Sequence, residues 1–316
     1  MTITLIKSGA FTTIQDLGRN GWQAYGMPVG GAMDRMAARF ANILLGNDEN
    51  EAVLEMTLVG PTIQFNENTI ISIFGANMAP KIFGKMIEIR KPISIKKGDI
   101  ITFGAAQSGV RTYLAVKGGF SLPKILGSKS TNVRANIGGP LQTGDVIQLN
   151  HSYSTNHFSW GLSFKLENYI HDRHVPIRYV KGPQYDLFTE ETKQALLESA
   201  FAISLHSDRM GYRLTGPKLS TNQKVELTTE GTTFGSIQVP PSGEPIILMA
   251  DGQPTGGYPK IGQIINVDLP RLSQIRPGEY IRFKEISLIE AQKQMLDQHK
   301  EFTAIKTACL IKWRDY

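Results

Sequence analysis

The chain has 316 residues, more than a single hydrophobic core usually serves, so two domains or one large domain are expected. Its composition, 41% hydrophobic and 20% charged residues, is ordinary for a globular protein and excludes a largely disordered chain. The formal net charge of +6 comes from lysines and arginines that are scattered along the sequence, which argues against a nucleic-acid partner.

The single cysteine and the absence of long apolar runs narrow the class further. Cys309 alone cannot form an internal disulfide and makes a thiolate metal site implausible. No apolar run reaches the roughly 18 residues that span a bilayer, and residues 1–7 lack the pattern of a signal peptide. We therefore expect a cytoplasmic protein without a membrane segment and without a metal site.

Short strands dominate the predicted secondary structure. Runs of β-branched and apolar residues predict strands at 2–7, 69–74, 100–103, 112–116, 146–149, 245–249 and 281–283. Three helices interrupt them: residues 34–46 with Asp34 as the N-cap, about 190–200 after Thr189, and 287 to about 302 with a capping box at Ser287 and Glu290. The pattern predicts a mainly β (α+β) fold with a few peripheral helices.

Internal echoes indicate a duplicated architecture. A turn glycine, an acid and a strand recur at 97–103, 143–149 and 277–283, and Leu-Val-Gly-Pro at 58–61 is echoed by Leu-Thr-Gly-Pro at 214–217. These echoes predict two related β-barrel-like halves, although hairpin chemistry repeated by chance would give the same signal. Residues 150–157 are typical of a linker. We place a boundary near residue 160, giving domains 1–160 and 161–316, the second ending in the C-terminal helix.

The most informative stretch is residues 249–260, a polar turn that follows the apolar strand 245–249. Three glycines in this turn allow a ligand to approach the backbone closely. The turn also offers a carboxylate, an amide, two hydroxyls and an ammonium group, from Asp251, Gln253, Thr255, Tyr258 and Lys260. This density is typical of a binding site, and a long hairpin whose glycines serve only turn geometry explains it equally well.

A second polar segment precedes that turn in the same half of the chain. Residues 207–214 combine the acid Asp208 with two arginines, Arg209 and Arg213. We expect these three residues to share a pocket with Gln238, Asp251 and Lys260. An arginine and a lysine there would hold a carboxylate substrate, and Asp208 or Asp251 would move a proton as the catalytic group.

A possible second site lies in the glycine-rich residues 15–34. Asp16, Arg19 and Asp34 give it charge, and an arginine can bind a carboxylate or a phosphate bidentately. The alternative is a structural Asp16–Arg19 ion pair that fixes a turn.

Other catalytic patterns fail on their spacing. Residues 127–131 resemble a phosphate-binding loop, but Ser128 stands where that motif requires glycine. His171 with His174 is more typical of a solvated turn than of a metal site. These residues disfavour ATP binding by a P-loop, a zinc enzyme and a serine hydrolase.

Taken in order, these segments resemble the antagonist-of-kinase-inhibitor family, also described as the C subunits of bacterial ATP-dependent 5-oxoprolinase. That family is related to the biotin-dependent carboxyltransferase region of urea carboxylase. The matching segments are residues 15–19, 31–34, 44–47, 116–120, 126–131, 207–214, 235–240 and 255–259.

The resemblance implies two cyclophilin-like β-barrel domains and two partners, the A and B subunits of 5-oxoprolinase, of which B is a kinase-inhibitor-like protein. The complex would open 5-oxo-L-proline to L-glutamate with ATP as a co-substrate. In this interpretation Arg209, Arg213 or Lys260 grips the carboxylate of the lactam, while Gln238, Gln253, Thr255 and Tyr258 complete the substrate site.

Two alternatives stay open. A biotin-dependent carboxyltransferase component would bind carboxybiotin in the same pocket, and any biotin must come from another chain because no Met-Lys-Met attachment site is present. A regulatory binding protein would antagonise an inhibitor of a histidine kinase and would need no catalysis.

Overall fold

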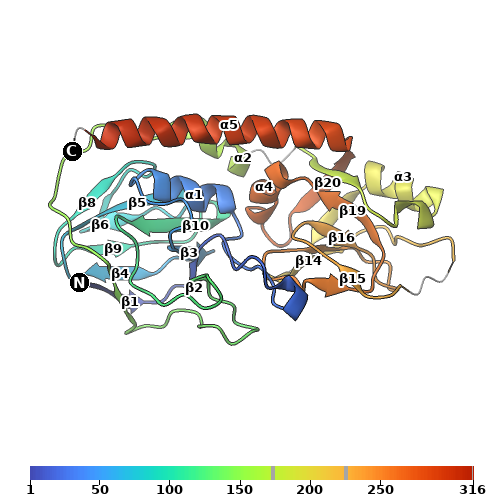
Figure 1. Cartoon of the computed structure of the whole chain (residues 1–316), viewed down its shortest axis with the longest axis horizontal. Coiled ribbons are helices and arrows are strands. Elements are labelled where there is room, and N and C mark those ends of the chain that lie inside the picture. The colour runs from blue at the N-terminus through green and yellow to red at the C-terminus, as the bar shows by residue number, and fades with distance from the viewer. Residues whose placement is uncertain (172–174, 224–226, 315) are drawn as a thin grey trace. The chain divides into compact units, whose positions relative to one another are not determined.

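The structure is a computed structural model that describes residues 1–171, 175–223, 227–314 and 316 (Figure 1). The chain forms two compact units, unit 1 from residues 1–19, 34–171 and 301–316, and unit 2 from residues 20–33 and 172–300. The boundary near residue 160 stays a prediction. Residues 20–33, before that boundary, belong to unit 2, and residues 161–171 and 301–316, after it, belong to unit 1.

Unit 1 is built on two antiparallel sheets, and both contribute to one hydrophobic core. The six-stranded sheet has the order β11-β1-β4-β9-β6-β7, and the five-stranded sheet has the order β2-β3-β10-β5-β8. The strands are β1 (Thr2–Lys7), β2 (Phe11–Gln15), β3 (Val53–Thr57), β4 (Thr62–Phe65), β5 (Thr69–Asn77), β6 (Lys81–Ile82), β7 (Lys85–Met86), β8 (Ile93–Ile95), β9 (Ile100–Thr102), β10 (Ser108–Val116) and β11 (Val146–Gln148).

Helices complete unit 1. Asp34 accepts a hydrogen bond from the backbone N–H of Ala37 at 2.9 Å, which confirms the predicted N-cap of the first helix. This helix packs on β5 and β10, and Gly46 follows it with a φ of 66°. The helical segments of this unit are α1 (Arg35–Ile43), η2 (Phe164–Glu167) and α2 (Asn168–His171).

Unit 2 is a closed barrel of seven strands in the order β12-β19-β16-β17-β14-β13-β20. A parallel pairing of β12 with β20 closes it, and all its other strand pairs are antiparallel. The strands are β12 (Ile177–Lys181), β13 (Ala200–Ile203), β14 (Gly211–Thr215), β16 (Ser236–Gln238), β17 (Ile246–Leu248), β19 (Lys260–Ile264) and β20 (Tyr280–Glu285).

Unit 2 also contains elements that are not part of the barrel. β15 (Glu230–Gly231) pairs with β18 (Thr255–Gly256) in a two-stranded sheet, which we call the small sheet. The helical segments are η1 (Gln23–Tyr25), η3 (Tyr185–Leu187), α3 (Glu190–Glu198), η4 (Asn266–Asp268) and α4 (Leu269–Ser273). The mainly β fold with peripheral helices, predicted from the sequence, is confirmed.

The recurring turn signature is one local structure used three times. Its glycines, at positions 98, 144 and 278, have φ values of 90°, 92° and 90°. In each copy the following acid accepts a hydrogen bond from the backbone N–H three residues earlier: Lys96 to Asp99, Gln142 to Asp145, and Arg276 to Glu279. Two copies lie in unit 1 and one lies in unit 2, so both units use the same turn to enter a strand.

The C-terminal helix α5 (Leu288–Trp313) runs 11 residues beyond its predicted end at Phe302. Ser287 accepts the backbone N–H of Glu290 at 3.1 Å, as expected for the cap. Neither glycine nor proline follows Phe302 within the helix, and the added turns bury Cys309 in unit 1. None of the helices among the described residues combines the length and apolar composition that crossing a bilayer requires.

Candidate functional site

The turn 249–254 leaves the barrel at the end of β17 and is held by backbone hydrogen bonds. The N–H of Asp251 donates to the carbonyl of Arg209 at 2.9 Å, and the N–H of Gly252 donates to the carbonyl of Met249 at 2.9 Å. The chain then passes through β18 of the small sheet and returns to the barrel as β19. The predicted polar turn therefore joins two barrel strands and also forms half of the small sheet.

Arg209 and Asp251 form a bidentate ion pair. The guanidinium Nε lies 2.8 Å from Oδ2 and Nη2 lies 3.0 Å from Oδ1, and both side chains are about nine-tenths buried. Nη2 also donates to the carbonyl of Gly31 at 2.6 Å. Because Gly30 donates to the carbonyl of Ala250, these contacts hold residues 30–31 against the barrel of unit 2. The substrate and proton-transfer roles of Arg209 and Asp251 stay predictions.

Asp208 and Arg213 lie on the neighbouring hairpin. The Asp208 carboxylate accepts the backbone N–H groups of Met210 and Gly211 at 2.8 and 3.2 Å, so it shapes the turn before β14. Arg213 is exposed on β14, and its backbone N–H donates to Ser207 Oγ. The contacts described for Asp208 are those of a turn-forming residue, and its catalytic role stays a prediction.

The buried carboxamide of Gln238 is the most unusual feature of this barrel. Gln238 ends β16 and is 1% exposed, yet its Nε2 donates to no acceptor among the described residues. Its Oε1 receives only a long contact of 3.5 Å from Gln253 Nε2. A buried donor without a partner costs about 1–3 kcal/mol, so this amide suits a ligand that brings an acceptor.

The small sheet covers that carboxamide. A Cβ added at Gly256 would lie 2.6 Å from Gln238 Nε2, so a larger residue there would have to displace the end of this side chain. The hydroxyl of Thr232 donates to the carbonyl of Gln253, which fixes the turn leading into β18. Thr255 and Tyr258, both predicted to bind substrate, are exposed on either side of Gly256.

Lys260 lies beside Gln238, because the two residues are register partners between β19 and β16. Lys260 is 6% exposed, and its ammonium donates to Glu230 Oε2 at 2.7 Å and to the carbonyl of Gly231 at 3.1 Å. Gln184 Nε2 donates to the same Glu230 oxygen at 2.9 Å. The hydrogen bond from Lys260 lowers the pKa of the Glu230 carboxyl. Sequence reasoning missed Gln184 and Glu230, which reach the site only through the barrel and the small sheet.

Residues 16, 19 and 34 of the predicted second site divide into two places in unit 1. The Asp16 carboxylate accepts hydrogen bonds from Gly18 N–H, Ser128 Oγ, Lys129 N–H and Ser130 Oγ at 2.6–2.8 Å. Arg19 donates to the backbone carbonyls of Ile125 and Ser130. Asp16 and Arg19 therefore organise the loop 125–130 that resembled a phosphate-binding loop.

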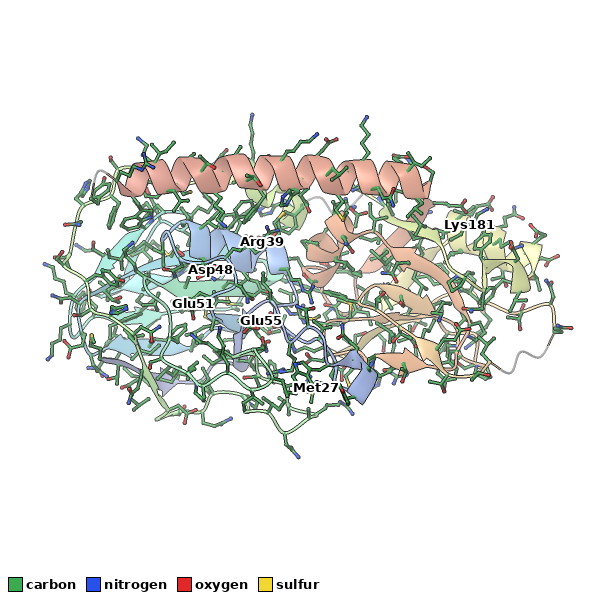
Figure 2. All side chains as sticks on the ribbon, in the orientation of Figure 1. Met27, Arg39, Asp48, Glu51, Glu55 and Lys181 are labelled. Atoms are coloured by element: carbon green, nitrogen blue, oxygen red, sulfur yellow. The ribbon has the colours of Figure 1, made fainter. Side chains whose placement is uncertain are left out.

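Asp34 instead belongs to a buried network at the start of α1. Its Oδ2 accepts the hydroxyl of Tyr169 at 2.6 Å, and its backbone N–H donates to the hydroxyl of Tyr113 at 2.8 Å. Tyr113 in turn donates to Glu55 at 2.8 Å; Glu55, labelled in Figure 2, lies in β3. Burial raises the pKa of both tyrosines well above the ordinary value. His174, named with His171 above, lies outside the described residues.

Comparison by sequence matches the chain to one family. The carboxyltransferase domain, subdomain A and B, matches residues 25–285. The 5-oxoprolinase C subunit of Haemophilus influenzae is 40% identical over 296 residues, covering 91% of this chain and 92% of that protein. The 5-oxoprolinase C subunit of Escherichia coli is 36% identical over 304 residues, covering 95% of this chain and 96% of that protein.

Comparison with solved structures agrees with the family found by sequence. The crystal structure of the Kluyveromyces lactis urea carboxylase is similar with a TM-score of 0.88 and 28% sequence identity. The match covers 95% of this chain and 29% of that chain, so this chain spans less than a third of the larger protein. The family match and the relatives of nearly equal length lead to the same conclusion. The chain belongs to the family of the carboxyltransferase domain, subdomain A and B, together with the C subunits of bacterial 5-oxoprolinase.

Proposed function

We propose that this chain is the C subunit of an ATP-dependent 5-oxoprolinase, which opens 5-oxo-L-proline to L-glutamate together with its A and B subunits. The observation that carries the proposal is the match to two 5-oxoprolinase C subunits. Each alignment covers more than nine-tenths of this chain and more than nine-tenths of the relative. A resemblance confined to one motif would support only a shared local structure.

The overall reaction consumes one ATP and two waters and yields glutamate, ADP and phosphate. An unstrained lactam resists attack by water. Transfer of a phosphoryl group from ATP to the lactam oxygen releases ADP and makes the ring carbon electrophilic. Water then attacks that carbon, the C–N bond breaks with the nitrogen keeping its electron pair and taking a proton, and a second water releases phosphate. ATP is a co-substrate of the whole complex in this proposal.

For this chain we assign binding of the lactam to Gln238. A lactam is a cis amide, so its N–H and its carbonyl oxygen point to the same side of the ring. The side-chain amide of glutamine presents a donor and an acceptor in the same arrangement. The two groups can therefore form a pair of hydrogen bonds, which would give Gln238 Nε2 the acceptor that no described residue provides.

Lys260 is assigned to the substrate carboxylate. It is the register partner of Gln238 on the neighbouring strand. Its present partner, Glu230, belongs to the small sheet. When the small sheet moves away to admit substrate, Glu230 leaves with it, and the substrate carboxylate replaces it on the buried ammonium.

The test is 5-oxoproline-dependent ATP hydrolysis and glutamate release by the complex of this chain with its A and B partners. Gln238→Met should raise KM on the order of tenfold or more without loss of stability, because it removes a buried donor that has no partner and preserves volume. Lys260→Met should raise KM likewise, whereas Lys218→Met, at an exposed ion pair with Glu244 on the same barrel, should not. Normal KM values for both site variants would refute the assignment of the site.

Carboxyl transfer is the second candidate, favoured by the family match and by the urea carboxylase structure. The ureido ring of biotin presents the same N–H and carbonyl pair as a lactam, so the Gln238 carboxamide fits it equally. Bound carboxybiotin would supply an activated carboxyl group, and Gln238 would orient its ring. A complex that fails to release glutamate but transfers labelled carboxyl groups from carboxybiotin to an acceptor would favour this function.

A further inference from the structure

The carboxylate of Glu230 lies at a point where two buried donors meet. Its Oε2 accepts the Lys260 ammonium at 2.7 Å and Gln184 Nε2 at 2.9 Å. Lys260 and Gln184 are 6% and 7% exposed, whereas 44% of the Glu230 side chain is exposed. The carboxylate therefore reaches a buried pair of donors from the surface of unit 2.

The contacts that hold the two donors do not involve Glu230. Lys260 is the first residue of β19, which pairs with β12 and β16 in the barrel. Gln184 Oε1 accepts the backbone N–H of Lys260 at 3.1 Å, and this bond fixes the side-chain amide. With Oε1 used in this way, Nε2 is the group of Gln184 that donates at the same point as the ammonium.

Glu230, by contrast, belongs to an element that can leave the barrel. The small sheet consists of two strands of two residues each, joined by two register pairs. A strand pair of this kind is marginally stable by itself. When it leaves, Lys260 and Gln184 lose their shared acceptor, and a buried ammonium without an anion is costly. Another carboxylate at the same point would restore both hydrogen bonds.

We propose that Lys260 and Gln184 form a subsite for the carboxylate of the substrate, and that Glu230 fills this subsite as a tethered competitor until the substrate displaces it. The identity of the substrate as 5-oxo-L-proline rests on the proposed function. The subsite gives Gln184 a part in recognising that substrate, because it supplies a second, neutral donor beside the charged one.

The tether makes the subsite selective. A carboxylate attached to the chain beside its own site has an effective concentration of about a millimolar or more. A free carboxylate such as acetate gains only this subsite and competes poorly with Glu230. A carboxylate joined to a lactam also gains the amide pair with Gln238, so it displaces Glu230 where acetate does not.

The first test is Glu230→Gln, which keeps the shape of the side chain and removes the competing charge. Its Kd for 5-oxo-L-proline, measured by calorimetry with the full chain, should fall on the order of fivefold. Its Kd for 2-pyrrolidinone, the same lactam without the carboxylate, should stay unchanged, because that ligand leaves the subsite to residue 230. Glu244→Gln is the matched control at an exposed ion pair with Lys218 in unit 2, and it should change neither value.

The second test is Gln184→Glu. This variant keeps the oxygen that accepts the backbone N–H of Lys260 and replaces the donor of the subsite by a second carboxylate. Its Kd for 5-oxo-L-proline should rise on the order of tenfold, while its Kd for 2-pyrrolidinone should stay unchanged.

Each outcome decides the proposal. Tighter binding of 5-oxo-L-proline alone by Glu230→Gln, with weaker binding by Gln184→Glu, supports the subsite. An equal gain for both lactams would show that Glu230 only fastens the small sheet, and that result overturns the proposal. Unchanged affinities, or no binding of 5-oxo-L-proline by the unaltered chain and by Glu230→Gln, overturn it as well.

The proposed function is tested separately by turnover of the complex with the A and B subunits. The supporting pattern of affinities without turnover would leave the carboxylate subsite in place and refute the proposed activity. Turnover combined with unchanged affinities would support that activity and refute the subsite.

Discussion

Gly256 lies so close to the Gln238 carboxamide that any larger residue must displace the small sheet or the amide. Gly256→Ala should therefore lower the free energy of unfolding by about 1 kcal/mol through overpacking. Gly231→Ala is the matched control on the paired strand, because a Cβ there meets no atom within 4 Å. Urea unfolding of both variants checks the difference, and equal stabilities would mean that the sheet does not press on Gln238.

The protonation of Lys117 is sensitive to folding. Burial lowers its pKa to about 8, while its ammonium lies 3.4 Å from the centre of the Trp313 ring and donates to the carbonyl of Leu45. The unfolded chain keeps an ordinary lysine pKa near 10.4, so at pH values between 8 and about 10.4 the unfolded state binds more protons.

The contribution of Lys117 to the free energy of unfolding is therefore fully present above the lysine pKa of the unfolded chain. It is lost as the pH falls through about 8, the pKa of Lys117 in the folded chain. In Lys117→Met this contribution is absent. The stability of the unaltered chain relative to Lys117→Met should rise between pH 7.5 and 10, measured by urea unfolding at constant salt. A difference that stays flat with pH would show that the ring compensates the lost hydration of the ammonium.

The chemistry of single residues was only partly predictable. Gln253 and Lys260 come from the polar turn that the sequence marked, and the barrel brings Gln238 beside them, as expected. Gln184 and Glu230 were missed because no spacing relates them to Lys260; Gln184 approaches it from the start of η3 and Glu230 from β15. Asp34 was grouped with Asp16 for its charge, although its predicted role as an N-cap accounts for its position.

Among the elements, the last turns of α5 do the most for unit 1. Trp313 Nε1 donates to the carbonyl of Leu44 at 3.0 Å, and its ring packs on Gly46, Phe158 and Trp160. Trp313→Ala should lower the free energy of unfolding by about 2 kcal/mol, less than for a fully buried tryptophan. Ile311→Ala, at an exposed position two residues earlier, should change it by less than about 0.5 kcal/mol.

The elements themselves were well predicted where the signal is local. Strand positions followed from β-branched runs between turns, and the starts of α1 and α5 followed from their caps. The end of α5 was not predicted, because its last 11 residues carry no stop signal and their burial depends on residues far away in the sequence. The attachment of residues 20–33 to unit 2 rests on similarly distant contacts.

At the scale of the whole molecule, the duplicated turn signature was the best sequence guide to the fold. The same hydrogen bond, from a backbone N–H to the acid that follows the glycine, forms in all three copies. The same short sequence pattern therefore gives the same turn in both units. The closure of the barrel by the parallel pair β12 and β20 could not be predicted, since about a hundred residues separate the two strands.

The exchange of segments between the units also constrains how the protein is made. Unit 2 takes Met33 into its core, and unit 1 requires residues 301–316, which follow unit 2 in the sequence. Unit 1 therefore cannot be completed before unit 2 has been synthesised, and until then part of the apolar surface of its earlier segments stays uncovered.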